Sequence, residues 1–450
     1  MQSFDVVVIG SGPAGEKAAT QAADHAKRVC VIDKGPSGGA WVNTGTIPSK
    51  TLRESARFLS RARGQNAFHD GSAMPTLRAS LALERHLVAS WREKVELRFR
   101  QRGIERARGH ARFIDANTVV LDDGQRIHGE HIVIAPGSSP RAIPELPVNG
   151  HTIHDSNTIL TLDEIPHSMI VLGGGVIACE YASIFQSLGV QVTLVNGRDS
   201  LLGFVDPEAT AFLEQSMKAA GMAVRHNARP LALGRSSMGE MDLNLSDGTI
   251  VSADTIFVAL GRVPATQGLD LDKAGISLSK WGTIEVNDYM QTSVPHIYAV
   301  GDVMGFPSLA SAGMEQGRVA ANHLCGLNRA PLDTLIPAGI FTIPEVSSVG
   351  MDERAAREAG FEPASGSLTY DENVRSHMIS ETRGLIKLVA DKQSGRLLGC
   401  AIVGHGATEL IHIGQMMIKY GGTVDELRRF VFNVPSLSAL YRQAAEQVPV

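Results

Sequence analysis

"VVVIGSGPAGEKAATQAADHAKRVCVIDKG", residues 6–35, is the stretch of sequence that decides the fold. It reads as an apolar strand, a glycine-rich turn, a helix and a second strand, the βαβ pattern that binds dinucleotides. Gly10 allows the tight turn, Gly12 lets the backbone approach a pyrophosphate, and Gly15 lets the helix pack close to the strand. Asp33 ends the second strand, where a carboxylate accepts hydrogen bonds from a ribose. The pattern predicts a dinucleotide site in the first part of the chain.

A second unit of the same kind lies further along the chain. "MIVLGGGVIACEYASIFQSLGVQVTLVNGR", residues 169–198, repeats the strand, turn, helix and strand. Gly173 and Gly175 take the first two glycine positions, and Ala178 takes the third, where a methyl group still permits close packing. The step from the first glycine to the residue that ends the second strand is 23 residues in both units. Two such units predict two dinucleotides on one chain.

The two units differ at the end of their second strand. Asn196 stands where the first unit has an acid, so no carboxylate selects a ribose 2′-OH or repels a 2′-phosphate. Arg198 offers a fork of donors that suits a 2′-phosphate, although an arginine here also suits an exposed loop. We therefore expect the second site to accept NADP(H) without excluding NAD(H).

Two further segments suit strands that deliver a loop to a bound ligand. "HIVIAPGSSPRAIP" (131–144) and "HIYAVGDVMG" (296–305) are apolar runs that end in glycine turns at Gly137 and Gly301. Asp302 follows directly, so a carboxylate lies beside backbone that a ligand can approach closely. The helix expected next would point its N-terminal NH groups toward that loop.

Together these segments resemble the flavoprotein disulfide reductases that bind two dinucleotides, such as lipoamide dehydrogenase and glutathione reductase. The resemblance implies one non-covalent FAD per subunit in the first unit and NAD(P)(H), as a substrate, in the second. It also implies that Asp302 holds the ribityl chain of the flavin. "ALGRVPAT" (259–266), which contains Gly261, resembles the motif that closes the nicotinamide domain and returns the chain to the FAD domain.

The implied fold class is α/β, with two Rossmann-like dinucleotide-binding domains, for FAD and NAD(P), and an α+β C-terminal dimerisation domain. A homodimer is expected, because twofold dimers are the common assembly of soluble enzymes, and a higher oligomer stays open. The expected segments are 1–142 for the first part of the FAD-binding domain, 143–264 for the NAD(P)-binding domain, 265–336 for the return segment of the FAD-binding domain, and 337–450 for the interface domain.

The redox disulfide of these reductases has no counterpart in the sequence. In "GGAWVNTGTIPSK" (38–50), Trp41 and Thr46 stand at the places of the two cysteines. In "FNVPSLSALYRQAA" (432–445), Val434 and Ala439 stand at the places of the acid–base His and Glu. Because thiolate chemistry needs a thiol and a base, lipoamide, glutathione and mercuric ion are excluded as substrates.

The flavin end of the site is retained. Lys50, in "IPSK", and Glu180, in the helix of the second unit, match residues that pair beside the flavin N5 in the reductases. The resemblance implies that they are the catalytic pair, with Thr46 in the flavin pocket. A lysine there can stabilise negative charge on the reduced flavin.

One branch of the reductases fits best. "CEYASIF", "NGRDSLLGFVD" and "GTIPSK" resemble the soluble pyridine nucleotide transhydrogenases. This likeness implies an enzyme of the Si-specific type that exchanges hydride between NADPH and NAD+ through FAD, without a redox disulfide.

Two alternatives stay open. One is an NAD(P)H:quinone or diaphorase-type reductase, and the other is a non-catalytic flavoprotein that senses nucleotide redox state. Trp41 stands where the transhydrogenases usually keep a cysteine, and Ala439 where they usually keep an acid. Trp41 either blocks or merely lines the flavin face opposite the nicotinamide.

Composition excludes several other classes. A net charge of −5 and a pI near 6.3 leave no basic footprint for nucleic acid or an anionic membrane. The sequence has neither the long apolar run of a membrane span nor a signal peptide, so a cytoplasmic protein is expected. The four cysteines are far apart, and no metal site is expected. His405 and His412 are better interpreted as satisfied core or interface residues than as metal ligands.

Overall fold

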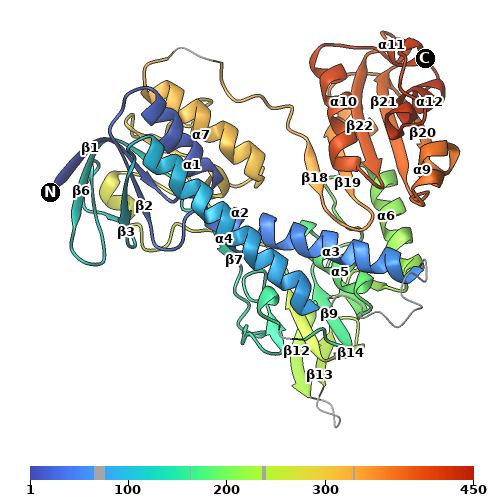
Figure 1. The fold of residues 1–450 in the computed structure, drawn as a ribbon, viewed down its shortest axis with the longest axis horizontal. Helices are drawn as coiled ribbons and strands as arrows, with labels where there is room; N and C mark the ends of the chain where they lie inside the picture. The colour runs from blue at the N-terminus through green and yellow to red at the C-terminus, as the bar shows by residue number, and fades with distance from the viewer. Residues whose placement is uncertain (65–76, 163, 236–239, 328–329) are drawn as a thin grey trace. The chain divides into compact units, whose positions relative to one another are not determined.

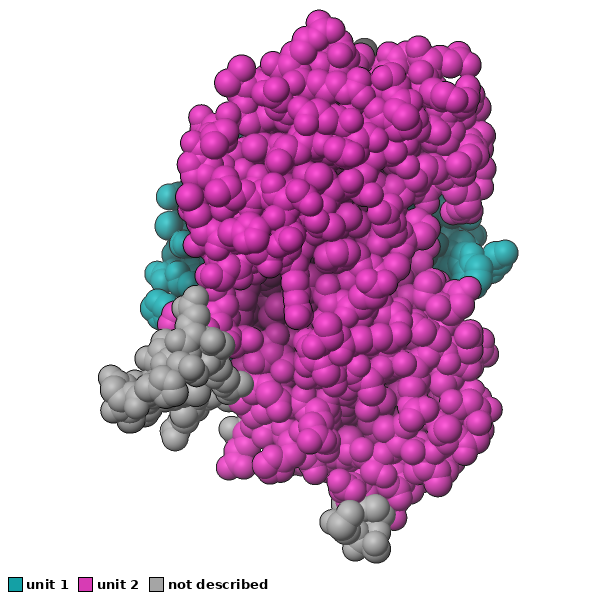
Figure 2. Space-filling model, turned by 90° about the vertical axis from the view of Figure 1, so that its right-hand side faces the viewer, with its two compact units in different colours: residues 1–52, 76–141, 261–333 teal, residues 53–75, 142–260, 334–450 magenta. Residues whose placement is uncertain are grey.

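A computed structural model describes residues 1–64, 77–162, 164–235, 240–327 and 330–450 (Figure 1). The chain forms two compact units, which Figure 2 draws in different colours. Unit 1 contains Met1–Leu52, Thr76–Arg141 and Gly261–Asp333, and unit 2 contains Arg53–Pro75, Ala142–Leu260 and Thr334–Val450. Each unit is therefore assembled from segments that are far apart in the sequence.

Unit 1 contains a largely parallel sheet. Its strands are β1 Gln2–Ile9, β2 Val29–Asp33, β3 Glu105–Arg108, β4 Arg112–Phe113, β5 Thr118–Val120, β6 Arg126–Ile134 and β17 Ile297–Ala299. They run in the order β3-β2-β1-β6-β5-β4, and β17 pairs in parallel with the last residues of β6. Successive residues of β1 pack into two different core clusters, so both faces of this strand are buried, as is typical of parallel sheets.

Two helices of unit 1 pack so closely against each other that only a glycine fits at one point of their contact. α1 Pro13–Asp24 and α7 Ala310–Leu324 lie side by side (Figure 1). A Cβ on Gly317 would lie 2.2 Å from the carbonyl oxygen of Ala14, so only glycine fits there. The other elements of unit 1 are α2 Gly39–Asn43, α4 Leu77–Gln101, the first residues of α3 Thr46–Gly64, the ribbon of β7 Ser138–Pro140 with β16 Arg262–Pro264, and the short helices η2 Leu271–Ala274 and η3 Gly301–Met304.

Unit 2 contains a second parallel sheet, of order β11-β10-β9-β15-β8. Its strands are β8 Ile153–His154, β9 Ser168–Leu172, β10 Gln191–Val195, β11 Ala223–Arg225 and β15 Thr255–Val258. α5 Val176–Ser187 connects β9 to β10, and α6 Pro207–Ala219 connects β10 to β11. η1 Ile159–Thr161 lies between β8 and β9 in the chain. A three-stranded sheet is formed by β12 Pro230–Arg235, β13 Met241–Leu245 and β14 Ile250–Ala253.

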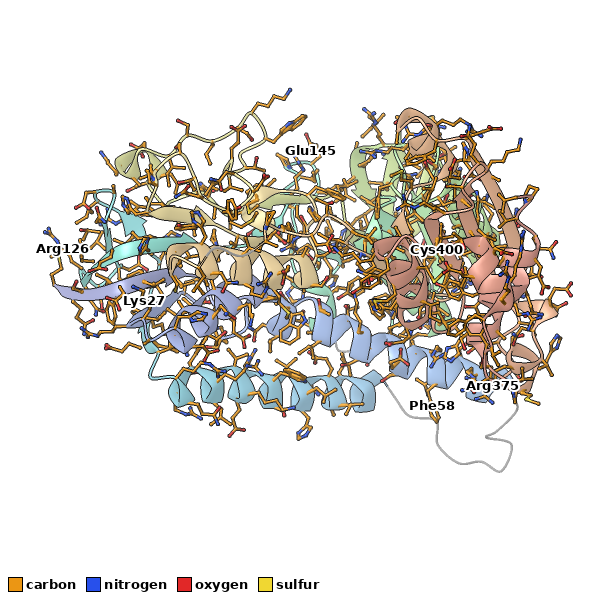
Figure 3. All side chains as sticks on the ribbon, turned by 90° about the horizontal axis from the view of Figure 1, so that it is seen from above. Lys27, Phe58, Arg126, Glu145, Arg375 and Cys400 are labelled. Carbon is orange, nitrogen blue, oxygen red and sulfur yellow. The ribbon has the colours of Figure 1, made fainter. Side chains whose placement is uncertain are left out.

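The C-terminal part of unit 2 is an antiparallel sheet of order β18-β19-β22-β21-β20, covered by helices. Its strands are β18 Ala338–Ile340, β19 Val346–Gly350, β20 Pro363–Thr369, β21 Leu385–Asp391 and β22 Leu397–Val403. β21 and β22 are buried along their whole length. Cys400, labelled in Figure 3, is one of the buried residues of β22. The helices are α8 Glu353–Glu358, η4 Tyr370–Glu372, α9 Val374–Met378, α10 Ala407–Lys419, α11 Val424–Arg429, η5 Leu437–Ala439 and α12 Leu440–Glu446.

No helix in the described parts of the chain is both long and apolar enough to cross a membrane. Within those same parts, no group of three or more His, Cys, Asp or Glu side chains is arranged to hold a metal ion.

Candidate functional site

The first glycine turn has the shape that a dinucleotide pyrophosphate needs. Gly10 has a φ of +103°, and a Cβ there would lie 2.2 Å from the Ala135 carbonyl oxygen. A Cβ on Gly15 would lie 2.0 Å from the Gly10 oxygen, so the helix contacts the turn directly. Gly12 differs, because the only atom within reach of its Cβ position is the Cα of Gly39, at 4.0 Å. The turn is thus closed against the protein and open beside Gly12.

The start of α1 suits an anion. Gly12 is the N-cap residue and provides no side-chain hydrogen bond to the first turn of the helix. The NH groups of that turn therefore keep their capacity to bind a phosphate, with the helix dipole favouring negative charge. The open space and the uncapped helix both fit a bound dinucleotide.

Asp33 is held in place beside the turn. Its Oδ2 accepts hydrogen bonds from the Ser11 backbone NH, at 2.7 Å, and from the Ser11 hydroxyl, at 2.5 Å. Its Oδ1 accepts from the Gly35 NH at 2.9 Å. The carboxylate of Asp33 is therefore held in one orientation by the protein itself. Both hydrogen bonds to its Oδ2 come from Ser11, a residue that the glycine motif does not mark.

Three other predicted segments converge within unit 1. The Ser138 hydroxyl, directly after Gly137, donates to Asp302 Oδ2 at 2.6 Å. Arg262, directly after Gly261, donates from Nε to the Ser138 hydroxyl oxygen at 2.8 Å and from Nη2 to the Ser138 carbonyl at 2.6 Å. These contacts tie together residues that the sequence identified only as separate motifs.

The short helix η3, which carries Asp302, also contacts α1. Gly301 has a φ of +79°, and a Cβ there would lie 3.1 Å from the Cβ of Ala14 in α1. The Gly301 NH donates to the Gln316 side chain of α7 at 2.8 Å. The start of η3, next to Asp302, thus lies beside the start of α1.

The second glycine turn repeats the first in unit 2. Gly173 has a φ of +124°, and its Cβ would lie 2.4 Å from the Ala259 carbonyl oxygen. No atom lies within 4 Å of the Cβ position of Gly175, which caps α5 without a side-chain hydrogen bond. This turn therefore offers a second open, uncapped helix start.

Asn196 takes the place in unit 2 that Asp33 takes in unit 1. It is 3% exposed, and a Cβ on Gly174 would lie 2.5 Å from its side chain. Its Oδ1 accepts from the Arg198 backbone NH at 3.2 Å, and its Nδ2 donates to the Ser200 carbonyl at 2.8 Å. The Arg198 side chain is exposed, so it is available to a ligand.

Of the predicted pair, Lys50 and Glu180, the structure defines a contact of Glu180. Glu180, 3% exposed in α5, accepts a hydrogen bond from the Phe341 NH at 2.8 Å. Ser183, one turn later, accepts from the Ile343 NH at 3.1 Å. Lys50 lies in α3 and belongs to unit 1, whereas Glu180 belongs to unit 2, so their pairing stays a prediction.

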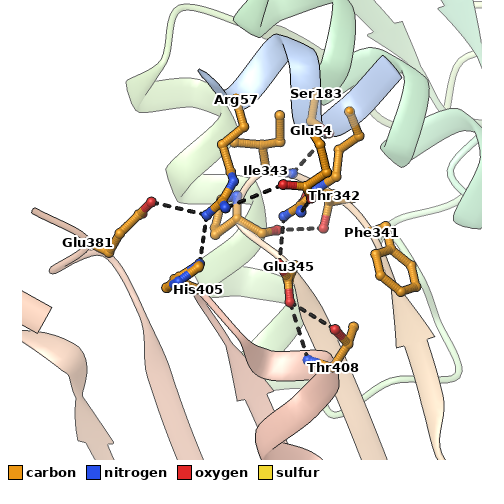
Figure 4. A network of polar contacts seen from close by, with 12 residues as sticks. Glu54, Arg57, Ser183, Phe341, Thr342, Ile343, Glu345, Glu381, His405 and Thr408 are labelled. Carbon is orange, nitrogen blue, oxygen red and sulfur yellow. Dashed lines mark hydrogen bonds and ion pairs between the residues drawn. The ribbon is translucent and has the colours of Figure 1, made fainter. Parts of the chain in front are cut away.

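A polar network anchors the segment that Glu180 contacts (Figure 4). The buried Arg53 guanidinium donates to the Thr342 carbonyl and pairs with Glu345 at 2.9 Å, and Glu345 also accepts from the Thr408 hydroxyl at 3.0 Å. Arg57 contacts His405 at 2.7 Å. The network fixes the backbone whose NH group orients Glu180.

The two histidines are held by protein groups and do not share a helix. Burial, followed by the Arg57 guanidinium, lowers the pKa of His405, so the ring is neutral. His405 precedes α10, while His412 lies within it and contacts Gln415 at 2.9 Å.

Trp41 and Thr46, which the resemblance places at the positions of the redox cysteines, lie in an aromatic contact and at a helix start. Trp41, in α2, meets Trp91, in α4, edge to face, with ring centroids 5.3 Å apart. Lys94 lies over the other ring at 4.4 Å from the Trp91 centroid. Thr46 is the first residue of α3. The Trp41 ring is thus engaged by α4.

No cysteine of the chain is paired or activated. All four are free. Burial raises the pKa of Cys30 and of Cys400, each to about 12, and also raises the pKa of Cys179 and Cys325. These thiols therefore stay protonated at neutral pH. Because only thiolates are strong nucleophiles, none of the four is activated. Val434, which the resemblance places at the position of the acid–base histidine, is 81% exposed.

Comparisons with known proteins agree with this geometry. Residues 4–317 match the pyridine nucleotide-disulphide oxidoreductase family, and residues 336–445 match the dimerisation domain of that family. A soluble pyridine nucleotide transhydrogenase from Mycobacterium tuberculosis is 38% identical over 458 residues, covering 100% of this chain and 97% of the relative. One from Hahella chejuensis is 36% identical and covers 98% of this chain and 97% of the relative.

Solved structures show the same fold over the whole chain. LpdA from Mycobacterium tuberculosis is 29% identical, with a TM-score of 0.89 and coverage of 99% of both chains. The HOCl-induced flavoprotein disulfide reductase RclA from Escherichia coli is 27% identical, with the same TM-score and coverage. The predicted α/β fold class, with its C-terminal dimerisation domain, is confirmed. The chain belongs to the pyridine nucleotide-disulphide oxidoreductase family.

Proposed function

We propose that the protein is a flavin-dependent pyridine nucleotide transhydrogenase that exchanges hydride between NADPH and NAD+. The observation that carries this proposal is the presence of two glycine turns, each open and each followed by a helix without a side-chain cap. Two such turns suit two dinucleotides. The name that the relatives from Mycobacterium tuberculosis and Hahella chejuensis carry supports the same activity here.

Residues of unit 1 would hold one non-covalent FAD per subunit. The first turn and α1 would bind the pyrophosphate, Asp33 the ribose, and Asp302 the ribityl chain. The flavin, when bound, accepts hydride from one nicotinamide and gives it to another. The residues proposed for this site are Gly10, Gly12, Gly15, Asp33, Thr46, Gly137, Gly301 and Asp302.

Residues of unit 2 would bind NADPH and NAD+ in turn. The open turn at Gly175 would take the pyrophosphate, while the neutral Asn196 neither repels a 2′-phosphate nor excludes a ribose. This tolerance suits an enzyme that must bind both nucleotides. The residues of unit 2 proposed for this site are Gly173, Gly175, Asn196 and Arg198. Gly261, which belongs to unit 1, is proposed separately as a cofactor-binding residue.

Lys50 and Glu180 are proposed as the catalytic pair. Lys50 would place an ammonium group where negative charge develops, and a positive group fixed in advance costs no reorganisation during the reaction. Glu180 would orient that ammonium group through an ion pair. The contact with the Phe341 NH supports this role, because it limits the positions that the carboxylate can take.

The exchange is proposed to need no redox disulfide. Trp41 and Thr46 replace the cysteines, and the four thiols of the chain are held protonated by burial. A transfer that begins and ends at a nicotinamide needs no thiol. Electron exit to a disulfide substrate is therefore not part of the proposed activity.

The remaining features are also proposals. We propose the Si-specific type of transfer, a homodimer formed through the interface domain, and a cytoplasmic location. The match to the dimerisation domain supports the assembly. The proposed domains are 1–142 with 265–336 for FAD, 143–264 for NAD(P), and 337–450 for the interface.

An anaerobic exchange assay tests the function. FAD-loaded protein is mixed with NADPH and thio-NAD+, and the absorbance of thio-NADH is followed, with a quinone in a parallel sample. Formation of thio-NADH without quinone is expected. Turnover only with the quinone would mean a quinone or diaphorase-type reductase instead. A flavin that neither NADPH nor NADH bleaches would contradict both activities.

A further inference from the structure

The second dinucleotide site contains a histidine that the glycine motif does not include. β10 and β11 are parallel, with Val195 opposite Arg225, and the Asn196 NH donates to the Arg225 carbonyl at 2.7 Å. The residues that follow the two strands are therefore neighbours. His226 Nδ1 lies 3.2 Å from Asn196 Nδ2, and the His226 side chain is only 20% exposed.

Two contacts fix which way the Asn196 amide points. Its oxygen accepts from the Arg198 backbone NH, and its nitrogen donates to the Ser200 carbonyl. A rotated amide would place a donor against the Arg198 NH and an acceptor against a carbonyl. The amide nitrogen must therefore face His226, and it must donate.

The donor from Asn196 defines the state of His226. Nδ1 must accept, so the ring donates from Nε2. Nε2 lies 3.0 Å from Glu214 Oε2 in α6 and donates to it, while Lys218 contacts the other oxygen of Glu214 at 2.6 Å. Partial burial alone would raise the pKa of Glu214, but the hydrogen bonds from Lys218 and His226 lower it. An ionised Glu214 thus selects the tautomer that accepts from Asn196.

This chain of contacts uses both hydrogens of the Asn196 amide. Only a lone pair of Oδ1 is left for a ligand, so Asn196 can accept from a ribose 2′-OH but cannot donate to a phosphate. It acts on NAD as a carboxylate would, without the negative charge that would repel NADP.

A 2′-phosphate must then find its donors elsewhere. Arg198 is exposed, and the side chain of Arg229, also exposed, lies against the same loop, with its Cγ 3.3 Å from the Cβ position of Gly197. In the described part of the chain neither guanidinium forms an ion pair. Asp199, the nearest acid in sequence, accepts a hydrogen bond from the Ser200 hydroxyl at 3.1 Å.

We propose that His226 is a positioning residue that sets nucleotide selectivity in the second site. By holding the Asn196 amide as an acceptor, it keeps a ribose 2′-OH bound at Asn196 and leaves a 2′-phosphate to Arg198 and Arg229. This inference rests on the proposed use of both nucleotides at this site. The balanced selectivity of the site depends on the contact between His226 and Asn196.

The test compares His226→Phe, which removes the acceptor and keeps a ring, with His226→Asn, which keeps an acceptor near the Nδ1 position. Dissociation constants for NADP+ and NAD+ are measured by calorimetric titration of the FAD-loaded protein. In the Phe variant a released Asn196 hydrogen can reach the phosphate, so affinity for NADP+ relative to NAD+ should rise about tenfold. The Asn variant should return the ratio toward wild type. Arg229→Ala should weaken NADP+ alone.

Controls separate selectivity from folding and from the proposed function. His151→Ala, an exposed histidine of the same unit, should leave the ratio unchanged. His226→Ala is a second variant without an acceptor, which keeps the comparison valid if the Phe variant does not fold. Equal weakening of both nucleotides, or an unchanged ratio, would overturn the role of His226. Because binding needs no turnover, a wild-type protein that binds both nucleotides but forms no thio-NADH would contradict only the proposed function.

Discussion

Ser11 and Gly174 occupy the same place in the two turns, between the first and second glycines. They contact the residue at the end of the second strand in different ways. Ser11 donates two hydrogen bonds to Asp33 and so ties the acid to the turn. Gly174 has no side chain, and the Asn196 amide fills the space that one would take. The pairing of serine with acid and of glycine with amide shows that each turn is adapted to the residue at the end of its own second strand.

This space gives a prediction for Gly174→Ala. A Cβ there would lie 2.5 Å from the Asn196 side chain, so the amide must move out of its hydrogen bonds. Both NADP+ and NAD+ should bind more weakly, by about tenfold, because at least one hydrogen bond is lost. Calorimetric titration measures this, and the FAD content should be unchanged. Gly234→Ala, where the nearest atom is at an ordinary 3.7 Å, is the control, and equal affinities in both variants would contradict the prediction.

Lys50→Ala tests the proposed catalytic pair. Removing a fixed positive group near the reacting atoms should slow reduction of the bound flavin by NADPH about 100-fold. Stopped-flow absorbance under anaerobic conditions measures that rate. Lys273→Ala, at an exposed lysine of η2, should leave it unchanged. A normal rate in Lys50→Ala, or a slow rate caused only by weaker NADPH binding, would remove Lys50 from the catalytic pair.

At the scale of elements, local patterns were predictable and distant contacts were not. Both glycine turns, with their strands and helices, follow from residues within 23 positions of one another, and the structure contains both. The link from Asp302 through Ser138 to Arg262 joins residues up to 164 positions apart, and no periodicity indicates it. The sequence therefore marked Gly137, Gly261 and Asp302 but missed Ser138 and Arg262, whose serine and arginine types are common in any loop.

The direction of the Trp41 side chain was beyond prediction for the same reason. In the structure Trp41 lies in α2 and its partner Trp91 in α4, and only the packing of the two helices brings the rings together. His226 is a similar case, since its contact with Asn196 requires the register of β10 against β11. A predicted pairing of these two strands would have marked the residue after Arg225 as a candidate.

The tryptophan contact predicts an energetic coupling between α2 and α4. Edge-to-face aromatic pairs contribute about 1 kcal/mol beyond the apolar area that they bury. In a double-mutant cycle of Trp41→Leu and Trp91→Leu, the double variant should therefore lose less unfolding free energy than the sum of the losses in the two single variants. The difference should be about 1 kcal/mol. Urea unfolding followed by flavin fluorescence measures it. Strict additivity would mean that the two rings do not stabilise one another.

At the scale of the whole molecule, unit 2 depends on a buried lysine that connects distant segments. Lys387, 5% exposed in β21, pairs with Asp206 at the start of α6 at 2.9 Å and with Glu353 of α8 at 2.7 Å. Burial alone would lower the pKa of Lys387, but the hydrogen bonds and ion pairs with Glu353 and Asp206 raise it. Burial alone would likewise raise the pKa of Glu353, which Lys387 lowers. The lysine thus joins α6, which follows β10 of the parallel sheet in unit 2, to the C-terminal antiparallel sheet.

Lys387→Met should lower the unfolding free energy by about 3–5 kcal/mol at neutral pH, because it leaves the buried Asp206 carboxylate and the partly buried Glu353 carboxylate without their lysine partner. The raised lysine pKa contributes stability below pH 10.5 that is lost as the pH rises above it, and the lowered Glu353 pKa contributes stability above pH 4.5 that is lost as the pH falls. The deficit of the variant should therefore be constant between these limits and shrink outside them. Urea unfolding at several pH values measures it. Lys392→Met, which removes the exposed ion pair with Glu362, should lower the unfolding free energy by under about 1 kcal/mol. A similar loss in both variants would show that burial adds nothing to the ion pairs of Lys387 with Asp206 and Glu353.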